Sequence, residues 1–382
     1  MKPSSYPFPL GRYTLLKQWK SDDWGIEFLA RQEGLAGCSK LAFLKTLAKP
    51  VAIDPTFVEL FLNEARIAAR LSHPNIVQIY ELNEVNGEYF IAMEYVHGHH
   101  LGTVLQAMQS KSLSFLPVLA AQLCIQILLG LRYAHMLEDE QGRPLNLVHK
   151  NLCPSNVLLG FNGAVKICNF GIPRTTPPEA KGGRALYVAP EQYVDGRIDA
   201  RVDVYATGVL LAELLLGKIP RHCNNAQQLT TAISQLPSVS STLADIVACA
   251  LFLNRDERFE SAREMALALE YYIEAADASQ VTVELANFLQ KLFGNNTSNP
   301  WLFYEMSLLE ADEHLSQTPS EPNIPDESPL LPPLQQSKGK TRLPKYLAAC
   351  LQCSPPPYLK WALASLLLVS TLCAIAWWLF HI

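Results

Sequence analysis

The sequence predicts an α+β domain with two lobes, the first rich in strands and the second rich in helices. From about residue 12 to 95 the pattern is typical of strands, with one interruption where Asp54 can cap a helix and Pro55 fits its first turn. From about residue 101 to 276 long helical patterns dominate, such as Leu116–Leu137. Strands gathered in one half and helices in the other favour an α+β arrangement.

Composition excludes several classes of protein. The chain has 382 residues, of which 49% are hydrophobic and 18% charged, so most of it can bury a core. A net charge of −5 gives no sign of a surface for nucleic acid, and we expect no such partner. The nine cysteines are scattered without a disulfide or zinc pattern, which fits a reducing cytosol.

An uncharged run of 20 residues, 361–380, predicts a transmembrane helix near the end of the sequence. As a helix it would be about 30 Å long, which matches the hydrocarbon core of a bilayer. A buried core helix is the alternative. Basic residues precede the run, at Lys338, Lys340, Arg342, Lys345 and Lys360. The positive-inside rule therefore predicts a tail-anchored, single-pass protein on the cytoplasmic face of the inner membrane.

These observations divide the chain into five parts. The prediction is an N-terminal tail at 1–11, a two-lobed domain at 12–276 with lobes 12–95 and 96–276, a helical extension at 277–317, a linker at 318–360 and the membrane helix at 361–380. Ten prolines between residues 318 and 357 favour an extended linker over a folded domain.

Several short motifs occur in a fixed order along the predicted domain. Val148–Leu159 resembles the catalytic loop of bacterial Ser/Thr protein kinases, H-R-D-L-x-x-x-N. Downstream, Val165–Gly171 resembles the strand and D-F-G turn of that family, Ala189–Glu191 matches A-P-E, and Asn254–Phe259 resembles a late motif whose arginine pairs with the A-P-E glutamate. The resemblance implies the protein kinase fold, with a small β-rich lobe containing one helix and a large helical lobe.

The resemblance also implies structural roles that this sequence keeps. Asp203 is expected to hold the backbone of the catalytic loop, and Glu191 is expected to pair with Arg258 inside the second lobe. His149 and Phe170 match two members of a hydrophobic spine between the lobes.

The positions that perform phosphoryl transfer in this family are altered. The catalytic base is replaced by Asn151, whose amide cannot accept a proton at neutral pH. The first metal ligand is replaced by Asn169, while the second, Asn156, is kept. Two neutral amides are a poor site for Mg²⁺, which favours carboxylates. Lys150 replaces the arginine that a phosphorylated activation segment would contact.

The loop that covers the phosphates in the family has lost two of its three glycines. Alignment places Lys20, Asp22 and Gly25 at the three positions. The Cβ atoms at the first two would keep the backbone away from a phosphate. Asp22 would also face the phosphates with like charge.

The predicted adenine site is altered as well. Lys45 matches the phosphate-binding lysine, and Phe43, two residues earlier on the same strand, points to the same side, where the family has a small residue. Glu27 replaces an apolar residue that covers the adenine. The remaining predicted cleft residues are Met93, Glu94, Val96 and Leu158. Lys45 and Glu64 match an ion pair that we expect to keep a structural use.

These changes predict a catalytically inactive member of the family, a pseudokinase that acts as a scaffold or allosteric partner of other proteins, such as an active kinase or its substrates. No cofactor is expected. Two alternatives stay open: a weakly active Ser/Thr kinase that uses ATP and Mg²⁺, and a nucleotide sensor without turnover.

Overall fold

The structure is a computed structural model that describes residues 6–21, 25–34, 38–47, 55–111, 113–170, 183–193, 198–220, 222–276 and 281–294. The predicted linker and membrane helix lie outside these residues. The residue at the second predicted glycine position, Asp22, also lies outside them.

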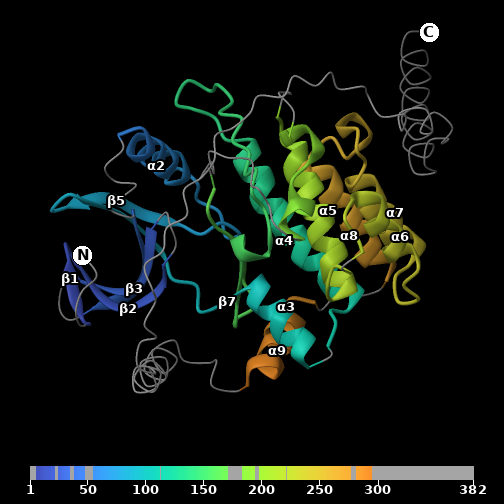
Figure 1. Cartoon of the computed structure of the whole chain (residues 1–382), viewed down its shortest axis with the longest axis horizontal. Coiled ribbons are helices and arrows are strands. Elements are labelled where there is room, and N and C mark those ends of the chain that lie inside the picture. Colours follow the sequence, from blue (N-terminus) through green and yellow to red (C-terminus); the bar gives the residue numbers. More distant parts are fainter. Residues whose placement is uncertain are drawn as a thin grey trace, which may run out of the picture. The chain divides into compact units, whose positions relative to one another are not determined.

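The first lobe is a six-stranded antiparallel sheet with one helix (Figure 1). The order of its strands is β1 (Phe8–Leu10), β2 (Tyr13–Ser21), β3 (Gly25–Glu33), β4 (Ser39–Leu47), β6 (Glu88–Glu94) and β5 (Ile79–Val85), and the helix is α2 (Pro55–Ala68). The sheet begins at Phe8, four residues before the predicted boundary, because Leu10 is buried against Tyr13 and its neighbours.

Alternation along β4 divides the sheet into two faces. Ala42 and Leu44 are buried in a cluster with Phe28 and Phe90 on one face. Phe43 and Lys45 point to the other face, toward the second lobe. Alternate residues of β4 therefore belong to the core of the first lobe and to the wall of the cleft.

The second lobe is mainly helical. It begins with the small sheet β7 (Gly98–His100), β8 (Val157–Gly160) and β9 (Val165–Ile167). Its helices are α3 (Leu101–Ser110), α4 (Pro117–His135), α5 (Arg201–Leu216), α6 (Ala226–Ser234), α7 (Ser241–Ala250), α8 (Ala262–Ala275) and α9 (Val281–Phe293). Helices α4 and α5 carry apolar residues on nearly all sides, because other elements of the lobe surround them.

Helix α4 is the one helix in the described part of the chain that is long and apolar enough to cross a membrane. Most of it, 61%, is buried inside the lobe, with side chains such as Leu123, Ile127 and Leu131 in the core. Its composition is therefore explained by packing against α5 and α8.

Helix α9 packs against the second lobe beside α3 and α4. Leu285, Leu289 and Leu292 are buried, and the ring of Phe288 lies 4.9 Å from that of Phe115. The last turn of α9 places Phe293 4.3 Å from His99 of β7, measured between ring centroids. The apolar residues in the first part of the predicted extension thus complete the core of this lobe.

Candidate functional site

A cleft lies between the two lobes, and its outer part is a cavity of about 100 Å³. The sheet of the first lobe supplies Glu27, Phe43 and Lys45, and the connection between the lobes supplies Met93, Glu94, Tyr95 and Val96. The second lobe supplies Leu158, Cys168 and Asn169. The structure therefore brings most of the predicted cleft residues together around one cavity.

The catalytic-loop segment is fixed by Asp203, which is fully buried at the start of α5. Its carboxylate accepts hydrogen bonds from the backbone N–H of His149 at 2.8 Å and of Lys150 at 2.9 Å, and lies 2.8 Å from Nε2 of His135. Burial alone would raise the pKa of Asp203, but these hydrogen bonds and the neighbouring histidines hold it below its usual value. This carboxylate therefore orders the loop while remaining ionised.

Three asparagines meet at the positions predicted for the base and the metal ligands. Nδ2 of Asn169 donates a hydrogen bond to Oδ1 of Asn156 at 3.0 Å. Nδ2 of Asn156 in turn donates to the backbone carbonyl of Asn151 at 2.6 Å. The three residues form a chain of hydrogen bonds in which the N–H₂ groups of Asn169 and Asn156 each donate to an oxygen, and Asn151 accepts through its backbone carbonyl.

This chain of amides does not fit a magnesium ion. Mg²⁺ needs oxygen ligands and favours carboxylates. Here the side-chain oxygen of Asn156 accepts a hydrogen bond from Nδ2 of Asn169. Asn169 therefore directs a nitrogen, which cannot bind the metal, toward this oxygen. In the described residues no group of three or more His, Cys, Asp or Glu side chains could hold a metal ion.

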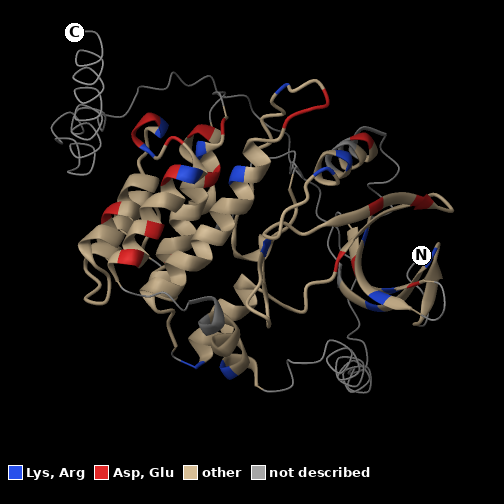
Figure 2. Ribbon diagram, turned by 180° about the vertical axis from the view of Figure 1, so that it is seen from behind, with Lys and Arg blue, Asp and Glu red and all other residues tan. Residues whose placement is uncertain are grey.

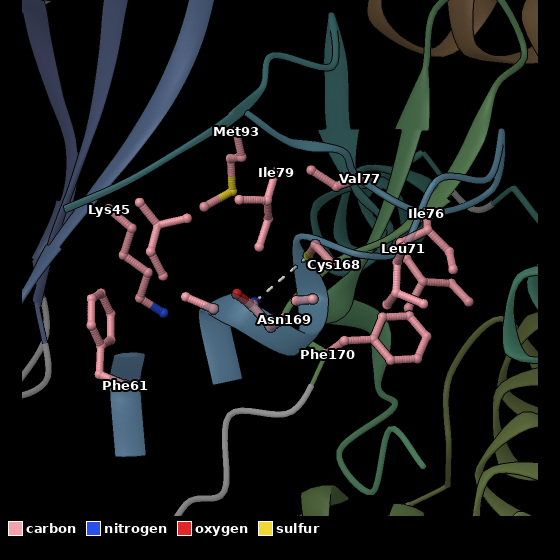
Figure 3. Close-up of a pocket in the computed structure, with 14 residues that line it drawn as sticks. Lys45, Phe61, Leu71, Ile76, Val77, Ile79, Met93, Cys168, Asn169 and Phe170 are labelled. Atoms are coloured by element: carbon pink, nitrogen blue, oxygen red, sulfur yellow. Dashed lines mark hydrogen bonds between the residues drawn. The ribbon is translucent and has the colours of Figure 1, made fainter. Parts of the chain in front are cut away.

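The backbone is left-handed at Asn169 and at Lys150, the residue before Asn151. Lys150 has φ 63° and Asn169 has φ 62°. Asparagine tolerates this conformation better than most residues, because its short side chain can form local hydrogen bonds. Asn169 also directs Nδ2 toward Sγ of Cys168 at 3.6 Å, the contact drawn in Figure 3.

Aromatic side chains narrow the outer cavity. The ring of Phe43 lines it and meets the ring of Trp19 edge to face, with centroids 6.2 Å apart. The register of β2 and β3 shifts between Gln18 and Lys20, so Trp19 lies in a bulge. A bulge redirects a side chain out of the regular alternation, which explains how Trp19 reaches the cleft.

Trp19 is one of the cleft residues that the sequence did not identify; Tyr95 and Cys168 also line the cavity. The tryptophan precedes a position aligned with a glycine, and nothing in the alternation of β2 shows that the register shifts there. The side chain of Lys20 is outside the described side chains.

Two side chains of opposite charge lie next to each other on the wall of the cleft. Glu27 on β3 is the direct cross-strand neighbour of Lys45 on β4, and both side chains line the outer cavity. The pKa of Cys168 is raised to about 12, mainly by burial; the charge of Glu27 contributes to the rise and that of Lys45 opposes it. Both charges therefore lie close to Cys168 at the inner end of the cavity. The carboxylate offsets the positive charge that a phosphate would need.

A second, smaller cavity of about 40 Å³ lies behind Met93 (Figure 3). Lys45 and Phe61 line it from the first lobe, and Asn169 and Phe170 line it from the second. The predicted partner of Lys45, Glu64, is on α2, but its side chain is outside the described side chains, so this ion pair stays a prediction.

The segment that joins the lobes is held by an ion pair. Oε2 of Glu94 lies 3.0 Å from Nζ of Lys166 on β9 and accepts a hydrogen bond from the backbone N–H of Gln78. Both side chains of the ion pair are largely buried. Glu94, a predicted cleft residue, thus ties the first lobe to β9.

The structural residues form close contacts below the cleft. Arg258, whose side chain is fully buried, donates from Nη1 and Nη2 to the two carboxylate oxygens of Glu191 at 2.7 and 2.8 Å. The ring of His149 lies 4.6 Å from that of Phe170, and its Nε2 lies 3.0 Å from the carbonyl of Cys168. Burial lowers the pKa of His149, so its ring is neutral at neutral pH.

Comparisons with known proteins agree with this geometry. A family model described as "Protein kinase domain" matches residues 37–298. "Tyrosine-protein kinase MasK" of Myxococcus xanthus is 32% identical over 302 residues, which are 75% of this chain and 47% of the relative. "Serine/threonine-protein kinase PrkC" of Bacillus subtilis is 30% identical over 270 residues, which are 67% of this chain and 39% of the relative.

Solved structures show the same fold. The Mycobacterium tuberculosis PknI kinase domain has a TM-score of 0.54 and 26% sequence identity, and the match covers 70% of this chain and 98% of that one. The chain spans less than half of the length of the two curated relatives. The family match begins at residue 37, after the strands that carry the altered phosphate loop.

Proposed function

This chain belongs to the protein kinase family, and we propose that it is a binding module rather than a catalyst of phosphoryl transfer. In this proposal the kinase fold serves as a scaffold or allosteric partner for other proteins, such as an active kinase or its substrates. Residues 361–380 tether it to the cytoplasmic face of the inner membrane.

The observation that carries the proposal is the hydrogen bond between Asn169 and Asn156, at 3.0 Å. Transfer from ATP needs metal ions to neutralise the phosphates and a base to accept the proton of the substrate hydroxyl. The two metal positions are hydrogen-bonded to each other instead, and the position of the base is the amide of Asn151.

The outer cavity supports the same conclusion for the nucleotide. Its volume of about 100 Å³ is below the range of roughly 300–1,000 Å³ typical of ligand sites. Trp19 and Phe43 occupy its wall, and Glu27 brings a carboxylate toward the adenine and phosphates. Placing a carboxylate against an apolar base costs desolvation free energy without a compensating hydrogen bond.

The test is nucleotide binding and turnover by the full chain. We expect ATP with Mg²⁺ to leave the melting temperature unchanged. A ligand at one hundred times its Kd would stabilise the folded state by about 2.7 kcal/mol, which corresponds to roughly 5–10 °C for a domain of this size. A shift of that size would refute a closed cleft.

A weakly active kinase is the second candidate, because Lys45 lines the cleft and curated relatives are named as kinases. Autophosphorylation that disappears in Lys45→Met would establish it and refute the binding module. The third candidate, a nucleotide sensor, predicts ATP-dependent stabilisation without any transfer of the terminal phosphate.

A further inference from the structure

One end of the second lobe carries lysines and exposed leucines. We call this the basic end and define it by Lys111, Leu113, Leu116, Lys218 and Lys291. The five residues come from the segment between α3 and α4, the segment after α5, and the last turns of α9. All five are exposed, Leu113 to 46% and Leu116 to 64%.

Contacts between the segments make the basic end one continuous surface. Nζ of Lys111 donates to the backbone carbonyl of Leu292, next to Lys291, at 2.6 Å. Nε2 of Gln109 donates to the carbonyl of Gly217, next to Lys218, at 3.3 Å. Three stretches that are distant in sequence are therefore neighbours at this end.

Among the described residues, the segments that form the basic end carry no carboxylate. Residues 98–137, 214–244 and 285–294 contain no Asp or Glu, and the side chain of Glu284 is outside the described side chains. Figure 2 shows blue without red on α9 and on the segment after α3. Acidic residues of the lobe gather elsewhere, for example at Glu138, Asp139, Asp199 and Asp256, where arginines pair with several of them.

The lysines and exposed leucines of the basic end are suited to binding a lipid surface. A basic face attracts the anionic headgroups of a cytoplasmic leaflet, and apolar side chains beside the lysines can enter the boundary between headgroups and acyl chains. A single exposed leucine is ordinary on a soluble protein. Two exposed leucines within four residues, among lysines and without described carboxylates, are less ordinary.

We propose that the basic end docks on the anionic lipid surface of the membrane to which the chain is tethered. The proposal rests on the membrane tether of the proposed function. It gives the domain one orientation, in which the end formed by α3 and α9 contacts the headgroups. The acidic end, which we define by Glu138, Asp139, Asp199 and Asp256, then faces the cytoplasm. An acidic partner protein is the competing occupant of the same surface.

The experiment uses the full chain in two nanodiscs, one of phosphatidylcholine alone and one with about a third phosphatidylglycerol. Hydrogen–deuterium exchange is measured on peptides that cover residues 109–119, 215–222 and 285–294. We expect exchange of the first two peptides to slow several-fold in the anionic nanodisc. At 0.5 M NaCl the Debye length falls to about 4 Å, and the protection should be lost.

Two variants test the residues. In Lys218→Glu/Lys291→Glu the lipid-dependent protection should disappear, because each lysine near an anionic surface is worth about fivefold in binding. Leu113→Ser/Leu116→Ser should reduce it. The control, Arg143→Glu/Arg263→Glu, makes the same change in charge at exposed positions near the acidic end and should behave as the wild type.

The outcomes separate the two proposals. A chain that does not enter nanodiscs would refute the tether. A chain that inserts but exchanges equally in both lipids, or whose double glutamate variant keeps its protection, would refute docking of the basic end on lipid. Equal exchange in both lipids is also the result expected for a surface reserved for an acidic protein.

Discussion

Replacing Asn169 by aspartate is the sharpest test of how this cleft differs from a metal site. Asn169→Asp removes the N–H₂ group that donates to Oδ1 of Asn156 and places a carboxylate oxygen opposite that atom, near 3.0 Å. Asn156 is buried, so its oxygen loses a partner that water does not readily replace. A buried acceptor left without a partner costs about 1–3 kcal/mol. Residue 169 is half-buried, so we expect a cost of about 1 kcal/mol. This cost corresponds to a fall in Tm of roughly 2–4 °C.

Magnesium should restore the stability of Asn169→Asp but should not stabilise the wild-type protein. Two facing oxygens, one of them charged, form a better site for a hard cation than two hydrogen-bonded amides. At ten times its Kd the ion would contribute about 1.4 kcal/mol, or roughly 3–5 °C. The assay is thermal unfolding with and without 10 mM MgCl₂, with Asn224→Asp as an exposed control. A wild-type protein that MgCl₂ stabilises as much as the variant would refute the reasoning.

Three further predictions concern stability and the cleft. Glu191→Ala should lower the free energy of unfolding, measured in urea, by about 3–5 kcal/mol, because it leaves the buried guanidinium of Arg258 without its carboxylate. The control Glu257→Ala, at an exposed position, should lower it by under 1 kcal/mol. The free energy of unfolding should fall as pH drops below about 6.5. Burial holds the pKa of His149 below its value in the unfolded state, so only the unfolded state gains the proton. Urea titrations at pH 7.5 and 5.5 should show a smaller fall in the variant His149→Phe than in the wild type. Trp19→Ala should widen the outer cavity and increase binding of adenosine in a calorimetric titration, and equal, undetectable binding by both proteins would contradict the role of Trp19.

The fold could be predicted from the sequence because its signals are local and redundant. Ordered motifs place Asp203, Glu191 and Arg258, and the hydrogen bonds among their segments need only the family's topology. The single helix of the first lobe was predicted with Pro55 in its first turn, and α2 begins at that residue. The same reasoning placed Phe43 on the cleft side, because strand alternation is independent of distant contacts.

The finer features of the site depend on contacts that spacing does not encode. Trp19 reaches the cleft through a shift in strand register. The hydrogen bond between Asn169 and Asn156 depends on the left-handed backbone at Asn169 and on how β8 and β9 bring the two loops together. Lys291 of the basic end follows Lys111 by 180 positions, so the proximity of these two residues follows only from the packing of α9.

Restoring the two aspartates should not restore phosphoryl transfer, because the alterations reinforce one another. Asn151→Asp/Asn169→Asp would return a base and a metal ligand, but ATP would still meet the ring of Phe43 and the carboxylate of Glu27 beside Lys45. Widening the cleft with Phe43→Ala/Glu27→Val should therefore be needed before nucleotide binds, and the quadruple variant should bind ATP with Mg²⁺ where the double variant does not. Isothermal titration of both variants measures this difference. Equal ATP affinity in the two would show that the loss of metal ligands alone accounts for the state of the cleft, and that its aromatic wall is incidental.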